Sequence, residues 1–217
     1  MQGFFWKERI EDNYVGHILA EIYKDGVYKP FLEGKENLVI VDIGANIGLT
    51  GYYFSQFASK VYSIEPSKEH FECMQKMIEF NQISNIVPIN VGILSQEGEF
   101  DLFHNQNRTM FSFHTAIADR NLIPEKARVI TLPTLFKEQN IEHVDFMKLD
   151  VEGSEQEILG HSSFSEVAPK IDSILLENHS WNGRHPNQLK EALKNRGFIV
   201  EQIPNDASLV YAHKWIK

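Results

Sequence analysis

The sequence contains a single cysteine, Cys73, among its 217 residues, so one chain cannot form an internal disulfide. It also lacks a long apolar run. Residues 1–16 include an aromatic cluster, but no stretch there has the length that a membrane span or a signal peptide requires. Because a lone thiol is compatible with a reducing compartment, we predict a cytoplasmic protein that does not insert into a membrane.

Clusters of basic residues are missing as well. The formal net charge is −9, which leaves no broad positive surface for a phosphate backbone, so we expect no nucleic-acid partner. Hydrophobic residues make up 42% and charged residues 24% of the chain, as in an ordinary soluble domain with a full core. The composition does not indicate an oligomeric state.

Short apolar runs alternate with segments of helical periodicity, which predicts an α/β fold with a mostly parallel sheet. The expected strands are residues 38–41, 60–65, 86–90, 144–150, 171–177, 198–202 and 209–212. Helices are expected at residues 8–23, after Gly48, and at 67–81 and 186–195.

The chain is expected to consist of an N-terminal helical cap, residues 1–36, and a cofactor-binding domain, residues 37–217. Within that domain, residues 94–131 are polar and show only weak strand alternation. We interpret them as an inserted hairpin and loop over the carboxyl ends of the strands, and as a candidate lid for the acceptor. The alternative is a surface excursion without functional contacts.

The most informative segment joins a buried strand to a helix through a glycine turn. Asp42 follows the apolar run 38–41, and the turn reads GANIG from Gly44 to Gly48. Glycine permits backbone conformations closed to other residues and lets a ligand approach the main chain. A dinucleotide-binding turn would place a second glycine at Asn46, which weakens that interpretation.

Glu65 is expected to end the second strand, 21 positions after Gly44 (65 − 44). A carboxylate there can accept two hydrogen bonds from a ribose diol. Two acids at strand ends and a GxxxG turn together suit S-adenosylmethionine, which has a ribose and an amino acid end but no pyrophosphate. The alternative is a simple glycine cap or hinge with a surface glutamate.

A second motif, MKLDVEGSEQEILG, begins at Met147. Lys148 and Asp150 are two positions apart and share one face of the expected strand, with Asp150 at its carboxyl edge. Glu152 then begins the turn. These side chains could contact a cofactor or acceptor, or they could form a structural ion pair.

With VDIGANIG, SIEPS, INVGI, FMKLDVEGSEQEILG and ILLEN, residues 37–178 resemble the FkbM-like methyltransferase family. The resemblance implies a Rossmann-like class I methyltransferase fold, with helices on both faces of a seven-stranded, mostly parallel sheet in the order 3-2-1-4-5-7-6. It also implies that S-adenosylmethionine supplies a methyl group to a hydroxyl oxygen of a sugar or another small molecule. The cofactor residues that it implies are the loop of Asp42, Gly44, Asn46 and Gly48, then Glu65 at the ribose, Pro66 and Asn90 near the adenine, and Asp150 at the reacting centre.

A hydroxyl acceptor must also lose a proton. We predict His179, which directly follows the fifth expected strand, as the general base, with Lys148 and Asp150 as further catalytic candidates; His114 and His185 are weaker ones. Tyr52, Phe111 and Trp181 could stack on an acceptor or belong to the core.

We predict no metal ligands, although Asp150, Glu177 and Asn178 could hold Mg²⁺ as an alternative. Functional alternatives are methyl transfer to nitrogen of a small molecule, a cofactor-binding protein without turnover and, more distantly, a nicotinamide-dependent oxidoreductase.

Overall fold

The computed structural model describes residues 12–105, 111–114, 122–179, 186–204 and 206–215. The main sheet has seven strands in the order β3-β2-β1-β8-β9-β11-β10. They are β1 Leu38–Ile43, β2 Ala58–Ile64, β3 Ile86–Ile89, β8 Phe146–Leu149, β9 Ser173–Glu177, β10 Ile199–Gln202 and β11 Leu209–His213. All neighbours pair in parallel except β10 with β11 and β11 with β9. The predicted fold class and strand order are therefore confirmed.

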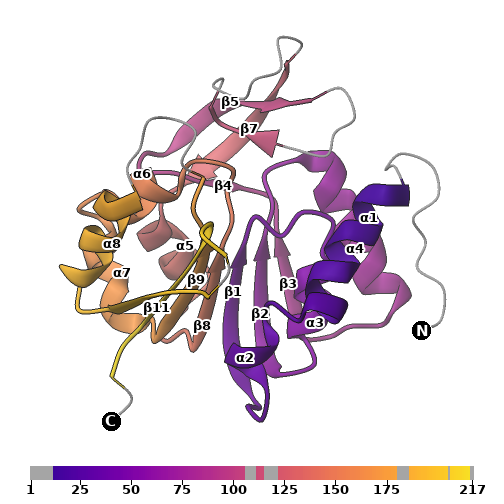
Figure 1. Ribbon diagram of the computed structural model, residues 1–217. Helices are drawn as coiled ribbons and strands as arrows, with labels where there is room; N and C mark the ends of the chain where they lie inside the picture. Colours follow the sequence, from indigo (N-terminus) through magenta and orange to yellow (C-terminus); the bar gives the residue numbers. More distant parts are fainter. Residues whose placement is uncertain (1–11, 106–110, 115–121, 180–185, 205, 216–217) are drawn as a thin grey trace.

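Helices cover both faces of this sheet (Figure 1). One face carries α1 Asp12–Leu19, the π-helical η1 Ala20–Asp25, α2 Lys29–Leu32, α3 Leu49–Phe54 and α4 Lys68–Phe80. The other carries α5 Leu132–Glu138, α6 Glu155–Gly160, α7 Phe164–Val167, the 3₁₀ turn η2 Ala168–Lys170 and α8 Pro186–Lys194. None of the helices in the described part of the chain is long and apolar enough to cross a membrane.

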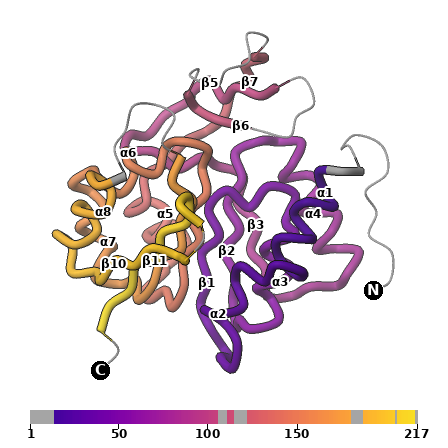
Figure 2. Tube along the Cα trace, in the orientation of Figure 1, coloured from indigo at the N-terminus to yellow at the C-terminus, as the bar shows by residue number. Residues whose placement is uncertain are grey.

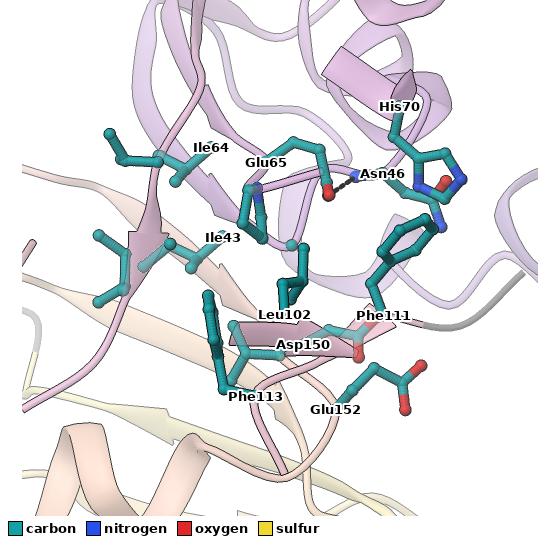
Figure 3. A pocket seen from close by; sticks show the side chains of 16 residues that line it. Ile43, Asn46, Ile64, Glu65, His70, Leu102, Phe111, Phe113, Asp150 and Glu152 are labelled. Atoms are coloured by element: carbon teal, nitrogen blue, oxygen red, sulfur yellow. Dashed lines mark hydrogen bonds between the residues drawn. The ribbon is translucent and has the colours of Figure 1, made fainter. Parts of the chain in front are cut away.

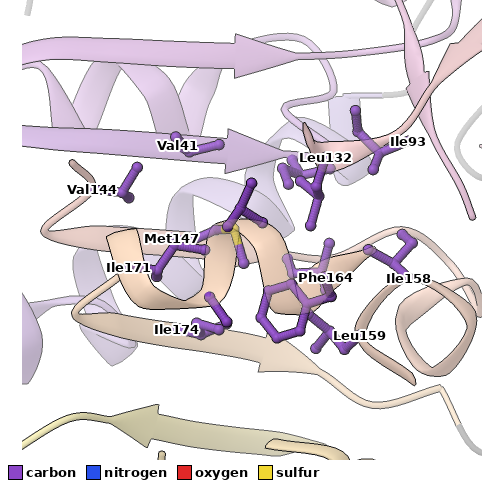
Figure 4. Packing of buried hydrophobic residues seen from close by; sticks show 14 of the residues in the cluster. Val41, Ile93, Leu132, Val144, Met147, Ile158, Leu159, Phe164, Ile171 and Ile174 are labelled. Carbon is purple, nitrogen blue, oxygen red and sulfur yellow. The ribbon is translucent and has the colours of Figure 1, made fainter. Parts of the chain in front are cut away.

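Strand alternation divides the interior into two cores. Ile40 of β1 packs with Phe54 of α3 in one core, whereas its neighbour Val41 faces the second core, beside Met147 of β8 and Phe164 of α7 (Figure 4). Both β1 and β8 are buried on both faces. Apart from Asp42 and Lys148, which pair with each other, both strands are apolar, as expected for strands covered on both faces.

The N-terminal helix differs from its predicted range of 8–23. Regular α-helix ends at Leu19 and continues as a π-helical segment to Asp25, where Gly26 ends it at φ 66°. Residues 8–11 lie outside the described part. Within the described residues, helical structure therefore extends two positions beyond the predicted end.

A second, smaller sheet stands above one end of the main sheet (Figures 1 and 2). Its strands, in the order β4-β7-β5-β6, are β4 Gly92–Ile93, β7 Ile123–Ile130, β5 Gly98–His104 and β6 Phe111–Ser112. Strands β5 and β7 pair antiparallel, from Gly98 opposite Val129 to His104 opposite Ile123, with β6 between them in the sequence. Residues 94–131 thus contain regular strands where the sequence shows only weak alternation.

Candidate functional site

The glycine turn lies where β1 leaves the sheet, directly beside the end of β8. Gly44 has φ +80°, and a Cβ added there would lie 1.7 Å from the backbone oxygen of Asp150. Gly48 has φ +90°, and its Cβ would lie 2.8 Å from side-chain atoms of Met74 and of Met77 in α4. Any larger residue would therefore have to displace the β8 turn at the first position or α4 at the second.

Two of the predicted loop residues do not line the cavity that opens at this edge. Gly48 forms the N-cap of α3 instead, and Asp42 is fully buried beneath the turn. Gly44 and Asn46 do line the cavity. Asp42 and Gly48 therefore lie in the same loop in supporting positions, and the role of the four residues at the methionine end of the cofactor stays a prediction.

Glu65 follows β2, and its side chain is almost completely buried at the cavity wall. Its Oε2 accepts a hydrogen bond from the Asn46 N–H and its Oε1 accepts one from the Ser67 N–H, both at 2.8 Å (Figure 3). Burial raises the pKa of Glu65 to about 7, although these two hydrogen bonds favour the charged form. Each carboxylate oxygen keeps one further lone pair for a ligand.

The cavity contains about 580 Å³ of space between protein atoms, a volume that includes open solvent. Its walls come from the ends of β1, β2 and β8 and from the second sheet (Figure 3). Pro66, predicted near the adenine, lines the cavity. His70, Leu102, Phe111 and Phe113 line it too, although the sequence analysis did not assign them to a cofactor site (Figure 3).

Asn90, predicted near the adenine, is outside the residues that line this cavity. Its Nδ2 donates to the backbone oxygens of Glu65 at 2.9 Å and of Pro66 at 3.1 Å. Asn90 therefore fixes the segment that follows β2 and supports the cavity wall from outside.

The N-terminal helix contacts the glycine turn through one polar pair. Tyr14 in α1 and the side-chain amide of Asn46 form a hydrogen bond. Asn46 has φ 53°, an unusual value for a residue with a Cβ, and its own Oδ1 accepts from the Ile47 N–H at 2.7 Å. Burial raises the pKa of Tyr14 to about 12, so its hydroxyl stays protonated and donates or accepts as a neutral group.

Lys148 in β8 is buried and ties the turn to the sheet. Its Nζ donates to the Gly44 backbone oxygen at 3.0 Å and lies 3.5 Å from Asp42 Oδ1 and 3.4 Å from Asp150 Oδ2. Burial opposes its charge, but the carboxylates of Asp150 and Asp42 outweigh that effect and raise the pKa of Lys148. Lys148 is therefore a permanent cation, which fits an electrostatic anchor and not a base.

His179 lies just beyond β9 and is surrounded by carboxylates. Its Nδ1 is 2.8 Å from Glu155 Oε1, and its Nε2 is 3.4 Å from Glu152 Oε2, 3.8 Å from Glu177 Oε1 and 4.0 Å from Asp150 Oδ1. Burial opposes protonation, but the hydrogen bond to Glu155 and the neighbouring negative charges raise the pKa of His179 to about 9. A histidine that already holds a proton at neutral pH is poorly suited to the predicted role of general base.

The pKa values of two neighbouring acids are raised as well, which favours the neutral form of each acid. Burial, followed by the charge of Asp150, raises the pKa of Glu152 and that of Glu177 to about 7. Asp150 and Glu152 line the cavity, so this group of charges forms one side of its mouth. Asp150 also forms a group of possible metal ligands with Glu152 and His179, whose ligand atoms lie within 4.8 Å of one another. The Mg²⁺ alternative of Asp150, Glu177 and Asn178 stays a prediction.

The second sheet contacts the same turn from above. Ser112 Oγ donates to the Glu152 backbone oxygen at 2.7 Å, and His114 Nε2 lies 3.1 Å from Ser154 Oγ. His114 is therefore near the site, while His185 and Trp181 lie outside the described residues. Phe111 also reaches the cavity, with its ring 4.5 Å from that of His70, whereas Tyr52 does not line it.

Comparison with known proteins agrees with this geometry. The family described as Methyltransferase FkbM domain matches residues 42–200. The chain belongs to the FkbM methyltransferase family. The predicted family and its methyl donor, S-adenosylmethionine, are thereby confirmed.

Similar proteins extend over nearly the whole chain. Methyltransferase sdnD of Sordaria araneosa is 24% identical, over 91% of this chain and 89% of its own. A methyltransferase structure from Geobacter sulfurreducens has a TM-score of 0.53 at 13% identity and covers 96% of this chain and 91% of its own. SMU.1697c of Streptococcus mutans, solved in complex with SAH, has the same TM-score and identity and covers 88% and 97%. At these identities the two structures support the fold alone.

Proposed function

We propose that this chain transfers a methyl group from S-adenosylmethionine to a hydroxyl oxygen of a small molecule, with a sugar as one candidate class. The observation that carries the proposal is the cavity wall at Glu65. A buried carboxylate is held there by two backbone amides, and a lone pair on each oxygen is left for a diol. The net charge of −9 supports a small-molecule acceptor over nucleic acid, and a cytoplasmic location stays a prediction.

The residues fit S-adenosylmethionine from end to end of the cavity. Glu65 would bind the ribose, Pro66 with Phe111 would enclose the adenine, and Gly44 with Asn46 would contact the amino acid end. The cofactor supplies a methyl group on a positively charged sulfur. The protein's task is to align the acceptor with that methyl group, and positioning of this kind can provide about 7–11 kcal/mol.

The acceptor side of the cavity is its acidic edge. Asp150 and Glu152 face it from the β8 turn, and the turn is itself fixed by the second sheet through Ser112. We therefore assign acceptor binding to the space between this turn and the second sheet, while Lys148 holds the turn that contacts the cofactor. Residues 94–131 accordingly keep their proposed role as part of the acceptor site.

Methyl transfer to nitrogen is a second candidate, favoured by one observation. Asp150, Glu152 and Glu177 make the edge strongly acidic, and carboxylates can bind the cationic amine of an acceptor. A screen with matched pairs of sugars or phenols, each carrying either a hydroxyl or an amino group at one position, separates the two. Faster S-adenosylhomocysteine release with the amino member would reverse our preference.

Isothermal titration with S-adenosylmethionine and S-adenosylhomocysteine tests the cofactor assignment. We expect micromolar binding by the unaltered chain and much weaker binding by Glu65→Gln. The matched control is Glu72→Gln, an exposed position of α4 outside the cavity. Binding of neither compound would reject the proposal. Binding without turnover across the acceptor screen would favour a cofactor-binding protein instead.

A further inference from the structure

One histidine at the acidic edge is oriented by a buried carboxylate. Glu155 is 2% exposed, and its Oε1 accepts hydrogen bonds from the backbone N–H groups of Val151 at 3.3 Å and Gly153 at 3.1 Å. The same oxygen lies 2.8 Å from His179 Nδ1. Glu155 thereby fixes the β8 turn and the imidazole ring together. Histidines that bind metals are commonly held in this way, with the other ring nitrogen facing the ion.

The second ring nitrogen of His179 faces possible ligands from the neighbouring strand end. Glu152 Oε2 is 3.4 Å and Asp150 Oδ1 is 4.0 Å from Nε2, and the three ligand atoms lie within 4.8 Å of one another. Ligands bound at about 2.1 Å around one ion are roughly 3–4 Å apart. Small side-chain rotations would therefore bring all three into contact with a single ion.

The charge of this edge also favours a cation. Asp150, Glu152 and Glu177 each place a carboxylate oxygen within 4.0 Å of the same imidazole nitrogen. Their side chains are 29–40% exposed, so an ion can enter from solvent. A nitrogen ligand beside carboxylates suits Mn²⁺ or Zn²⁺ better than Ca²⁺ or Mg²⁺, which prefer all-oxygen sites.

We propose that Asp150, Glu152 and His179 bind one divalent transition-metal ion at the acceptor side of the cavity. Glu155 acts as a positioning residue for His179, and Glu177 lies close enough to become a fourth ligand. The site differs from the all-oxygen Mg²⁺ alternative in its nitrogen ligand and in Glu152.

The use of the ion, unlike its binding, rests on the proposed methyl transfer to oxygen. A coordinated hydroxyl has a lowered pKa and can release its proton to solvent water near neutral pH. The oxygen then forms the new bond to the methyl carbon while the sulfur–methyl bond breaks, which leaves neutral S-adenosylhomocysteine.

A second group of potential ligands provides an internal control. His143 Nε2 lies 3.4 Å from Asp145 Oδ1 and 3.2 Å from Asp172 Oδ2, near the amino ends of β8 and β9. None of these three residues lines the cavity, and Asp145 Oδ2 already accepts from the Val39 N–H at 2.7 Å. The same His→Gln substitution can therefore be made in both groups.

The test is calorimetric titration of the full chain, stripped with EDTA and dialysed, with MnCl₂ and ZnCl₂, and with MgCl₂ for comparison. We expect one ion per chain, with Mg²⁺ the weakest. His179→Gln and Glu152→Gln should each remove stoichiometric binding, and His143→Gln should retain it. Glu155→Gln should weaken binding by about 10- to 100-fold, as loss of a supporting partner does.

Three outcomes would overturn the site. Metal binding could survive in both His179→Gln and Glu152→Gln, or it could be lost only in His143→Gln. The unaltered chain could also bind neither Mn²⁺ nor Zn²⁺ stoichiometrically. Circular dichroism of each variant checks its fold without any ligand, and two ligand variants allow for one that fails to fold. These metal titrations need no methyl donor, so failure of the proposed function leaves them interpretable. Turnover unchanged by EDTA in a metal-binding chain would overturn acceptor activation.

Discussion

Replacement of Lys148 by methionine tests whether this buried lysine holds the cofactor turn electrostatically. The change keeps an unbranched side chain but removes the charge next to Asp42, which is fully buried. Neither carboxylate oxygen of Asp42 accepts a hydrogen bond from the described residues, so Lys148 is its main compensation among them. The substitution also removes the 3.0 Å hydrogen bond to the Gly44 oxygen.

Removing one partner of a buried ion pair costs about 3–5 kcal/mol. Since domains are stable by only about 5–15 kcal/mol, Lys148→Met should lower the urea midpoint strongly. Adding Asp42→Asn should recover more than half of the loss, because a neutral amide needs no buried counter-charge.

The loss should also depend on pH in a defined direction. Burial already raises the pKa of Asp42, and removing Lys148 raises it further. Below the unfolded pKa of about 4, Asp42 is protonated in both states and the penalty is small. Above that value the unfolded state loses the proton first, so the penalty grows until pH passes the raised folded pKa.

Urea unfolding followed by intrinsic fluorescence at pH 5 and pH 8 measures these effects. The matched control is Lys126→Met, which breaks an exposed ion pair with Asp101 and should change the midpoint little. A penalty for Lys148→Met below about 1 kcal/mol, far under the cost of a broken buried pair, would refute the reasoning. So would equal penalties at both pH values, or no rescue by Asp42→Asn.

Three further substitutions test the cavity wall. Affinity for S-adenosylmethionine in calorimetry should fall as pH drops through about 7, the raised pKa of Glu65. Glu65→Gln should cost about 1.5–3 kcal/mol of binding free energy and remove this pH dependence. The same pH dependence in Glu65→Gln would contradict the role of this carboxylate. Tyr14→Phe removes the contact with Asn46 and should weaken cofactor binding by about 1 kcal/mol with little effect on melting; lower melting at unchanged affinity would argue for a structural role only. Gly44→Ala places a Cβ 1.7 Å from a backbone oxygen and adds the positive-φ penalty of about 1–2 kcal/mol, so it should abolish binding of S-adenosylhomocysteine. Its control, Gly16→Ala, meets nothing within 4 Å in α1 and should leave binding unchanged.

The main sheet could be predicted because its strands are buried on both faces. The continuous apolar run of β1 and the similar run of β8 leave little choice of structure, and glycines mark where β1 ends. The sequence indicates a turn at these glycines, but it does not show which neighbouring residues require glycine at each position. Gly44 admits the backbone of Asp150, and Gly48 admits α4, so both positions depend on neighbours distant in sequence.

The polar contacts of the site could not be predicted in the same way. Tyr14 meets Asn46 across 32 positions, and His179 meets Glu155 across 24. No local pattern encodes such pairs, because packing of separate elements creates them. The environment of His179 also affects its chemistry, because Glu155, Glu152 and Asp150 raise its pKa to about 9, which the sequence alone does not indicate.

The second sheet shows why polarity alone is a poor guide to function in residues 94–131. Strand β5 buries Leu102 and His104, while most of its other residues are exposed. Its sequence therefore lacks the continuous apolar run of a strand that is buried on both faces. The neighbouring β6 contacts the turn after β8 through Ser112, whose hydroxyl donates a hydrogen bond to the Glu152 backbone oxygen across 40 positions. Two segments that each resemble surface loops thus contribute to one wall of the cavity.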